Sequence, residues 1–327
     1  MMKRIFLALL MLALLAGCAA KPVAAPPGET KTAAADTAVQ TWPRQVKDAD
    51  GKMIEIKAKP MRIHTLSVGY DEITMRLVGP ERFAAVGTST VNPAYSNIAE
   101  QAKQVKAQIG RKSEDVLAAK PDLVVASPFA NKDLVKQLKE AGLTVVVTDL
   151  QDSMDGHAAN IRYLAYLYGE EAKGEALVKE VNDRLAKLDA VVGKKAQRPK
   201  VMSLSDTLNA PGQNTTMDGI IRRAGGVNAA AEAGIKGWQI ISLEKVVELK
   251  PDVIIVTDHQ VGQKDIGAEL MAQPSLQSVP AIKNHKVISM PGRLVSTLSP
   301  WNVRGAEELA KLLWPEDFKD VQFADFK

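Results

Sequence analysis

Apolar and polar residues follow a regular pattern along most of the chain, in which a short apolar run is followed by a segment with helical spacing. The apolar runs predict strands at residues 62–67, 83–87, 123–126, 144–148, 200–204, 253–257 and 286–290. The helical spacing predicts helices at residues 72–78, 132–141, 217–224, 268–272 and 303–313. Strands that alternate with helices form parallel sheets covered by helices on both faces, so the expected fold class is α/β.

The middle of the chain breaks this alternation. Residues 155–192 have a helical pattern without a strand signal, and Gly169 and Gly174 interrupt it. Its last part, residues 171–192, places apolar residues close to helical spacing. A long helix between two α/β segments is a stiff connector. We therefore expect two Rossmann-like lobes, at residues 43–154 and 195–327, joined by the helical segment 155–194, with a ligand cleft between the lobes.

One phrase of eleven residues occurs in each expected lobe. It reads EDVLAAKPDLV at residues 114–124 and EKVVELKPDVI at residues 244–254. Each copy predicts a short helix that begins with a carboxylate, ends at the Lys-Pro step because proline disfavours helix in the preceding residue, and leads into a buried strand. Two copies of one helix–strand unit indicate two similar lobes.

The N-terminal residues predict export and anchoring. Lys3 and Arg4 precede an apolar run at residues 5–15, which is the layout of a secretory signal peptide and is too short to cross a bilayer. The following Ala16, Gly17 and Cys18 complete a match to the lipobox of bacterial lipoproteins, which implies that Cys18 is lipidated. The alternative is a plain secretory peptide with an incidental cysteine.

Cys18 is the single cysteine of the chain, so an internal disulfide is excluded and an anchoring role explains its presence. We assign residues 1–18 to a lipoprotein signal peptide. Residues 19–42, which are rich in Ala, Pro, Thr and Lys, are assigned to a flexible tether. The expected location is the cell membrane, with the protein facing the periplasm or the cell exterior.

The charge pattern excludes one class of partner. The net charge is +4, and the basic residues are mixed with acidic ones instead of clustering. A nucleic-acid partner is therefore not expected.

Several motifs, in this order and spacing, resemble the iron-siderophore, haem and cobalamin substrate-binding proteins of bacterial ABC importers. They are the doubled phrase, Arg-Ala-Gly-Gly-Val-Asn at residues 223–228, Gly237-Trp238, and the segment 279–288. The resemblance covers about residues 43–315 and implies the class III binding-protein fold, with two lobes on one long helix. It also implies capture of an iron chelate, a ferric siderophore first, and delivery to an ABC permease dimer with its ATPase. Haem and cobalamin are the alternatives within the class, and no covalently bound cofactor is implied.

In that family a glutamate on the outer surface of each lobe pairs with arginines of the permease. Glu114 and Glu244, the first residues of the two phrases, occupy the matching positions. The alternative is that each carboxylate only stabilises a helix N-terminus through the macrodipole, by about 0.3 to 1 kcal/mol.

The ligand should contact loops that follow the strands, since strand ends face the cleft in such lobes. These loops lie at residues 67–71, 88–95 and 127–131 in the first lobe, and 206–213, 237–239, 258–260 and 292–301 in the second. The expected ligand-binding residues are the aromatic Tyr70, Tyr95, Phe129, Trp238 and Trp301 and the polar Arg111, His259 and Arg293. Trp238 matches a pocket tryptophan of cobalamin-binding relatives, whereas Gln108 replaces their second one, which argues against cobalamin.

Other functions find less support. The four histidines, His64, His157, His259 and His285, are scattered, and at most two could face the cleft, so a bare-metal site is not expected. Haem is not excluded as the ligand, and His259 or a tyrosine is then the candidate axial ligand. The chain has no nucleophile elbow, Walker loop, dinucleotide fingerprint or zinc-protease motif, so we do not expect an enzyme. A purely structural lipoprotein is the remaining alternative.

Overall fold

The computed structural model describes residues 41–149, 154–258 and 265–326, and these belong to one compact unit, residues 41–327. The expected signal peptide, most of the tether, Cys18 and His259 lie outside the described residues. One large hydrophobic cluster runs through both sheets and the helices above them, from Ile63 and Leu123 to Val201 and Val253. No helix of the described part is long and apolar enough to cross a bilayer.

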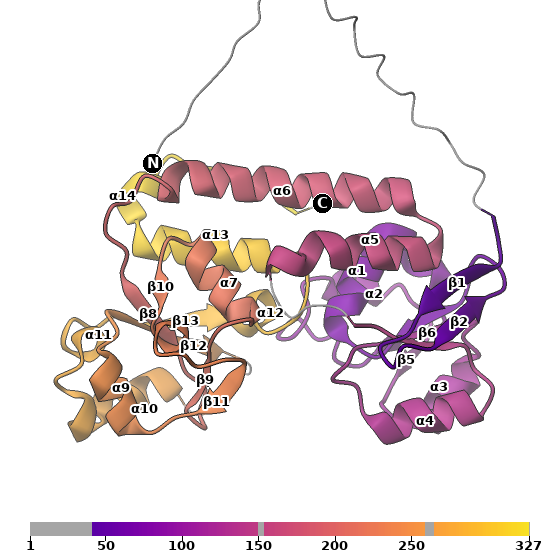
Figure 1. Cartoon of the computed structure of the whole chain (residues 1–327), viewed down its shortest axis with the longest axis horizontal. Coiled ribbons are helices and arrows are strands. Elements are labelled where there is room, and N and C mark those ends of the chain that lie inside the picture. The colour runs from indigo at the N-terminus through magenta and orange to yellow at the C-terminus, as the bar shows by residue number, and fades with distance from the viewer. Residues whose placement is uncertain (1–40, 150–153, 259–264, 327) are drawn as a thin grey trace, which may run out of the picture. The chain divides into compact units, whose positions relative to one another are not determined.

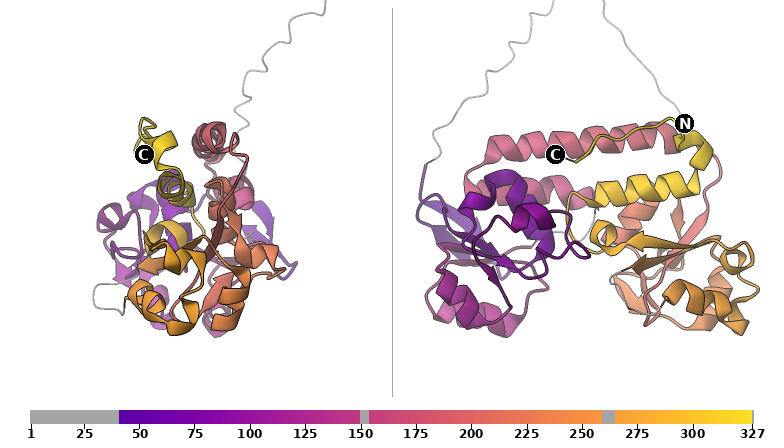
Figure 2. Two further views of the ribbon diagram at one scale, coloured as in Figure 1. Left: turned by 90° about the vertical axis from the view of Figure 1, so that its left-hand side faces the viewer. Right: turned by 180° about the vertical axis from the view of Figure 1, so that it is seen from behind.

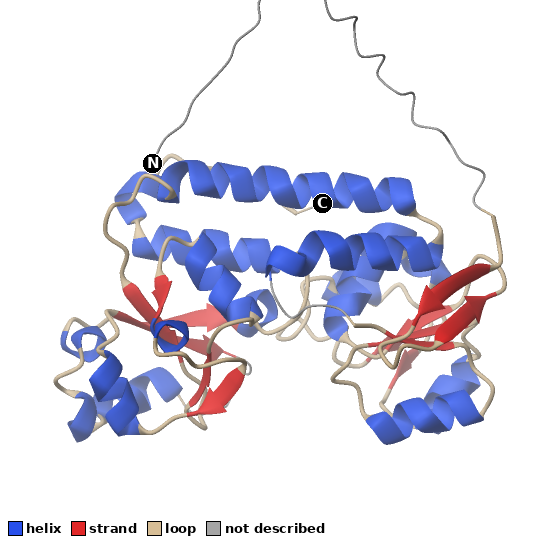
Figure 3. Cartoon of the chain, viewed as in Figure 1, coloured by secondary structure: helices blue, strands red, loops and turns tan. Residues whose placement is uncertain are grey.

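The first lobe contains a parallel sheet with helices on both faces (Figure 3). Its strands have the order β3-β6-β7, and β4 pairs with β5 beside them. The strands are β3 (Ile63–Thr65), β4 (Val86–Gly87), β5 (Gln108–Ile109), β6 (Leu123–Ala126) and β7 (Val145–Val147). The helices are α1 (Val68–Val78), α2 (Ala99–Ala102), α3 (Ser113–Ala119) and α4 (Lys132–Glu140), with a 3-10 turn η1 (Pro80–Arg82).

The second lobe repeats the scheme with a four-stranded parallel sheet in the order β10-β8-β12-β13. Its strands are β8 (Lys200–Ser203), β10 (Val227–Asn228), β12 (Val253–Asp258) and β13 (Val287–Pro291). Its helices are α7 (Thr216–Arg223), α8 (Ala229–Glu232), α9 (Leu243–Leu249), α10 (Ile266–Ala272), α11 (Pro280–Lys283) and α12 (Gly292–Val295), with a 3-10 turn η3 (Pro274–Leu276). Two parallel sheets confirm the α/β class and the two-lobe expectation.

The expected helical segment forms two helices, and the break between them lies at Gly169, one of the two expected interruptions. After the turn η2 (Met154–Gly156), α5 (His157–Tyr168) ends at Gly169, whose φ of 66° lies in the left-handed region. The 22-residue α6 (Glu171–Val192) then runs back beside it, and α13 (Asn302–Leu313) lies alongside α6 (Figures 1 and 2). Gly174 does not interrupt α6. Its missing side chain instead allows α6 to pack closely against Ala165 of α5.

Both copies of the repeated phrase fold alike. The helices α3 and α9 end at Lys120 and Lys250, which adopt left-handed φ values of 50° and 48°. Each lysine precedes a proline and then the buried strand β6 or β12. The helix stop at Lys-Pro is confirmed, and the left-handed conformation shows how each lysine avoids the helical region that the following proline disfavours.

Some short elements were not expected from the sequence. The hairpin β1 (Arg44–Lys47) and β2 (Met53–Ile56) precedes the first sheet, and β9 (Asn209–Pro211) pairs with β11 (Trp238–Ile240) in antiparallel fashion. The chain ends with α14 (Pro315–Phe318). Of these, β11 matters most for the site, because it carries Trp238.

Candidate ligand-binding site

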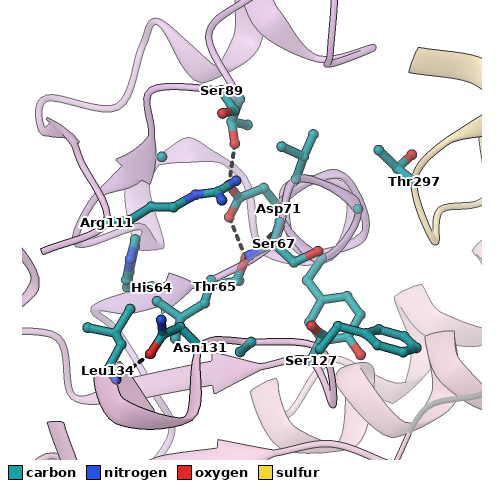
Figure 4. A pocket seen from close by; sticks show the side chains of 18 of the residues that line it. His64, Thr65, Ser67, Asp71, Ser89, Arg111, Ser127, Asn131, Leu134 and Thr297 are labelled. Atoms are coloured by element: carbon teal, nitrogen blue, oxygen red, sulfur yellow. Dashed lines mark hydrogen bonds between the residues drawn. The ribbon is translucent and has the colours of Figure 1, made fainter. Parts of the chain in front are cut away.

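A cavity of about 920 Å³ lies where strand ends and helix starts of the first lobe meet parts of the second. The first lobe contributes residues 64–71, 87–90, 109–114 and 127–131, together with part of α4. The second lobe contributes Thr216, Trp238 and residues 295–298. Much of the wall consists of hydroxyl side chains, among them Thr65, Ser67, Ser89, Ser127 and Thr297 (Figure 4).

The N-terminus of α1 forms part of the wall. Ser67 is the N-cap residue, and its side chain does not accept a hydrogen bond from the first turn. The amide groups of an uncapped first turn favour negative charge, so this end of the cavity suits an anion. Gly69 brings the two lobes together, because a Cβ atom at this position would lie 2.4 Å from the carbonyl oxygen of Leu298.

Charged side chains border the cavity beside α3. Arg111 and Lys112 are exposed, and neither forms an ion pair with any of the described residues. Figure 4 shows that Arg111 extends from the strand end into the cavity. The carboxylates of Glu114 and Asp133, in the first turns of α3 and α4, also border the cavity. The two cations therefore remain available to an anionic ligand.

Two aromatic rings are exposed at the cavity, one from each lobe. Phe129, in the loop after β6, is 77% exposed, and Trp238 on β11 is 51% exposed. A folded chain gains by burying such rings, so their exposure at one cavity marks a surface for an apolar or flat ligand.

Two neighbouring carboxyl groups of α1 are buried next to the cavity. Asp71 accepts hydrogen bonds from the hydroxyls of Thr65 at 2.7 Å and Thr90 at 2.6 Å. Glu72 accepts hydrogen bonds from the amide N–H of Asn97 at 2.7 Å and from its side chain at 2.9 Å. Burial raises the pKa of Asp71 and that of Glu72 to about 7 each, in spite of these hydrogen bonds.

The Asn97 side chain also joins the lobes. Its Nδ2 donates to Glu72 and, at 2.8 Å, to the carbonyl oxygen of Arg293 in α12. Because residues 295–298 border the cavity, this contact fixes one of its walls relative to α1.

The eight expected ligand-binding residues divide into groups. Phe129, Trp238 and Arg111 border the cavity. Tyr70 also borders it, but it lies within α1 instead of a loop, it is 0% exposed, and its hydroxyl hydrogen-bonds to Thr148 at 2.6 Å. His259 lies outside the described residues.

The other three, Trp301, Arg293 and Tyr95, do not border the cavity. Trp301 packs its ring 4.8 Å from that of Phe326 and rests against the core. Arg293 lies in α12, a helix where a loop was expected, and only the end of this helix reaches the cavity. Tyr95 is half-buried and is not among the residues that border the cavity.

The two expected docking glutamates are both exposed and both lie in the first turn of a helix. Figure 1 shows their helices, α3 and α9, on the side of each sheet that faces away from α6. The Ser242 hydroxyl lowers the pKa of Glu244. Glu114 differs from Glu244 in that it also borders the cavity.

The cavity offers little for direct metal ligation. The described residues contain no group of three or more His, Cys, Asp or Glu side chains that could hold a metal ion. Among the described residues that border the cavity, the His and Tyr side chains are those of His64 and Tyr70, and both are buried. His64 donates from Nδ1 to the carbonyl oxygen of Ala85 at 2.9 Å. An axial ligand for haem is therefore not presented by these two residues.

Sequence reasoning missed Lys112, Thr216 and the buried pair of Asp71 and Glu72. Lys112 follows β5, a two-residue strand too short to give an alternation signal. The burial of Asp71 and Glu72 has no sequence signal, because two adjacent acidic residues predict an exposed helix face.

A second cavity of about 540 Å³ lies within the second lobe alone and is bordered by Arg198 and Lys286.

Comparisons with known proteins agree with this geometry. The family described as "Periplasmic binding protein" matches residues 63–294. The "Uncharacterized ABC transporter substrate-binding lipoprotein YvrC" of Bacillus subtilis is 29% identical over 325 residues, which cover 97% of this chain and 98% of that protein. A "Cobalamin-binding protein" of Halobacterium salinarum is 31% identical over 77% of this chain and 68% of its own length.

A solved structure is also similar. The periplasmic haem-binding protein RhuT from Roseiflexus sp. RS-1, in its apo form, superposes with a TM-score of 0.68 at 26% identity. The match covers 78% of this chain and 98% of RhuT.

Proposed function

The chain belongs to the periplasmic binding protein family and is a substrate-binding protein of an ABC importer, and from this premise we propose that its cargo is an anionic iron chelate, a ferric siderophore first. The relatives are transport proteins, not enzymes. The chelate would occupy the cavity of about 920 Å³, within the usual range of ligand pockets of about 300 to 1,000 Å³.

One observation carries the proposal. A single cavity contains the guanidinium of Arg111, which has no ion-pair partner among the described residues, and two exposed aromatic rings from opposite lobes, those of Phe129 and Trp238. Iron chelates of this kind combine apolar or aromatic arms with negatively charged oxygen donors. The guanidinium can pair with such oxygens through charge-assisted hydrogen bonds, and the rings can cover the arms.

Cobalamin is the second candidate. Trp238 at the cavity and the similarity to a cobalamin-binding protein favour it. Haem is supported by the similarity to RhuT, but His64 and Tyr70 are buried and hydrogen-bonded, so neither is presented as an axial ligand. A bare ion or small oxyanion would leave most of the cavity unfilled.

Binding proteins of this family work with a permease and its ATPase. For this chain we propose that Glu114 and Glu244 pair with arginines of the permease dimer, because both are exposed and lie at matching positions of the two lobes. We also propose that lipid on Cys18 holds the protein at the cell membrane, facing the periplasm or the cell exterior. The lipobox match and the lipoprotein name of YvrC support the anchor.

Arg111→Ala tests the cargo proposal. We expect it to weaken binding of a hexadentate ferric tris-catecholate by about tenfold to a hundredfold, since hydrogen bonds to charged groups contribute about 1.5 to 3 kcal/mol. The matched control is Arg198→Ala, which removes another exposed arginine, at the second cavity, and should leave the affinity unchanged. Equal affinities of the two variants, measured by isothermal titration calorimetry, would contradict the proposal.

A further inference from the structure

Asp71 is a buried carboxyl group at the wall of the proposed cargo cavity. It is 1% exposed, borders the cavity, and forms no ion pair with any of the described residues. Its hydrogen bonds reach two parts of the wall, since Thr65 ends β3 and Thr90 belongs to the segment 87–90. A negative charge on Asp71 is therefore stabilised by two hydroxyl groups and the backbone amide of Gly87, without an ion-pair partner among the described residues.

Hydrogen counting shows that the site can hold Asp71 in either protonation state. The Thr65 hydroxyl has one hydrogen but two acceptors within reach, Asp71 Oδ1 at 2.7 Å and the Ser67 carbonyl oxygen at 2.9 Å. With Asp71 ionised, Thr65 donates to Asp71. With Asp71 protonated, the carboxyl donates to Thr65, and Thr65 donates to Ser67. Both arrangements use the same atoms and distances, so Asp71 can take up a proton without losing its hydrogen bond to Thr65.

We propose that Asp71 couples the binding of an anionic chelate to the uptake of one proton from solvent, so that the cavity holds such cargo more tightly in mildly acidic than in alkaline solution. The inference rests on the proposed function, because it requires a negatively charged cargo. A negative charge on the buried Asp71 and a negatively charged cargo repel each other, and protonation of the carboxylate removes this repulsion. By linkage, the anion favours the proton as much as the proton favours the anion.

Few groups around Asp71 change charge near neutral pH. On α1 itself, burial raises the pKa of both Asp71 and Glu72 to about 7. On β3, burial lowers the pKa of His64, which keeps that ring neutral. On α5, burial raises the pKa of Tyr168, which keeps that hydroxyl protonated.

The remaining charged groups near α1 and the cavity are engaged elsewhere or face the ligand. Arg82 of η1 pairs with Glu170, and Glu180 of α6 pairs with Arg76. Arg111, Lys112, Glu114 and Asp133 border the cavity and are exposed. Only Asp71 and Glu72 therefore combine burial with titration near neutrality among the described residues that surround α1.

Glu72 provides the matched control. It is as deeply buried as Asp71 and lies next to it in the chain, but it does not border the cavity. Its hydrogen bonds lead to Asn97 and, through Asn97, to Arg293. Its charge therefore acts on the contact between the lobes more than on the cargo.

The test is calorimetric titration of the purified protein with a trianionic hexadentate ferric tris-catecholate and with a neutral ferric tris-hydroxamate. Titrations in buffers of different ionisation enthalpy count the protons taken up, and the protonation of each chelate is measured without protein. We expect proton uptake with the trianion, little with the neutral chelate, and an affinity for the trianion that falls by up to about tenfold per pH unit above neutrality.

Three variants assign the effect. Asp71→Asn, which imitates the protonated carboxyl, should bind the trianion more tightly than wild type at about pH 8 and take up no proton. Glu72→Gln should keep the proton uptake. Thr90→Val removes a hydrogen bond that lowers the pKa of Asp71, so it should move the uptake to higher pH. A damaged fold would weaken binding, so a gain of affinity in Asp71→Asn cannot be caused by misfolding.

The outcomes separate this inference from the proposed function. Failure of both chelates to bind would overturn the proposed function and the inference with it. Binding of the trianion without proton uptake, or with the same pH dependence in wild type and Asp71→Asn, would overturn the inference alone.

Discussion

Single side chains of the cavity differ in what they contribute to binding and to folding, and two tryptophans illustrate the difference. Trp238 is exposed at the cavity, whereas Trp301 packs on Phe326 and against the core. Trp238→Ala should weaken binding of the ferric tris-catecholate by roughly 1 to 3 kcal/mol with little loss of stability. Trp301→Ala should leave the affinity for the chelate nearly unchanged and lower the free energy of unfolding by about 3 to 5 kcal/mol. Calorimetry and urea unfolding of both variants check this pair.

The two variants must behave differently for the site to be correctly located. Unchanged affinity in a folded Trp238→Ala protein would show that the indole does not contact the chelate. A large loss of affinity in Trp301→Ala, at unchanged stability, would move the site toward α13.

The buried carboxyl groups make stability depend on pH. In the folded protein the pKa of Glu72 is about 7, above the ordinary value of 4.5 that applies after unfolding. Between these values the folded state binds more protons, so the contribution of Glu72 to stability is present at low pH and is lost as pH rises through about 7. Glu72→Gln should therefore flatten the fall in unfolding free energy between about pH 5 and about pH 8.

Urea unfolding of wild type and Glu72→Gln at several pH values measures this difference. The comparison of two proteins is needed because His157 acts in the opposite direction. Burial lowers the pKa of His157 from 6.5 to about 4, so its contribution is lost as pH falls between these values. Parallel pH profiles of the two proteins would contradict the assigned role of Glu72.

Three of the expected ligand-binding residues, Arg111, Phe129 and Trp238, are exposed and border the cavity. Sequence reasoning did not place Trp301 and Arg293, because it could not show that the expected loop 292–301 begins with the four-residue helix α12 and that Trp301 packs against the core. An aromatic residue on a predicted loop can face a ligand or the core, and only the packing of distant segments decides which.

At the scale of helices and strands, the joint between α5 and α6 depends on two glycines with different roles. Gly169 ends α5 in the left-handed conformation, and Gly174 lets α6 approach Ala165. A Cβ atom at position 174 would lie 2.5 Å from Cβ of Ala165, closer than real Cβ contacts come. The two helices would have to separate to accept it.

Gly174→Ala should therefore destabilise the protein by about 1 to 3 kcal/mol, even though alanine favours helix over glycine by about 1 kcal/mol. Removing the opposing methyl group in Ala165→Gly should restore part of the loss. A double-mutant cycle by urea unfolding isolates the contact, with an expected coupling of about 1 to 3 kcal/mol. Zero coupling would show that the two helices are not held at this distance.

Strands and helices with a clear period were predicted from the sequence within a few residues, as at β6, β12 and α13. The sequence did not predict two pairs of short strands, the hairpin of β1 with β2 and the pair of β9 with β11. Short edge strands have a weak alternation of apolar and polar residues. The 155–192 segment was predicted as helical, but the reversal of direction at Gly169 depends on packing between α5 and α6.

For the whole molecule, function requires docking on the permease as well as binding. Reversing both proposed docking residues, Glu114→Lys with Glu244→Lys, should abolish import of the chelate in cells that lack another binding protein for it. Like charges that face each other across an interface repel. Affinity for the chelate should stay within a few-fold of wild type, with any change arising from Glu114, which borders the cavity.

Glu248→Lys is the control for this prediction. Glu248 is exposed one turn further along α9, so it shares the helix of Glu244 and its surroundings. This variant should import normally. Wild-type uptake by the double variant would show that the repeated phrase only supports the fold.

A side-by-side titration with four ligands determines whether the cavity binds an anionic iron chelate. Purified protein is titrated with a ferric tris-catecholate, a ferric tris-hydroxamate, haemin and cobalamin, and Trp238 fluorescence is compared between wild type and Trp238→Phe. The ferric tris-catecholate should bind most tightly and quench the Trp238 signal. Tight binding of cobalamin or haemin, with no measurable affinity for either ferric chelate, would contradict this prediction.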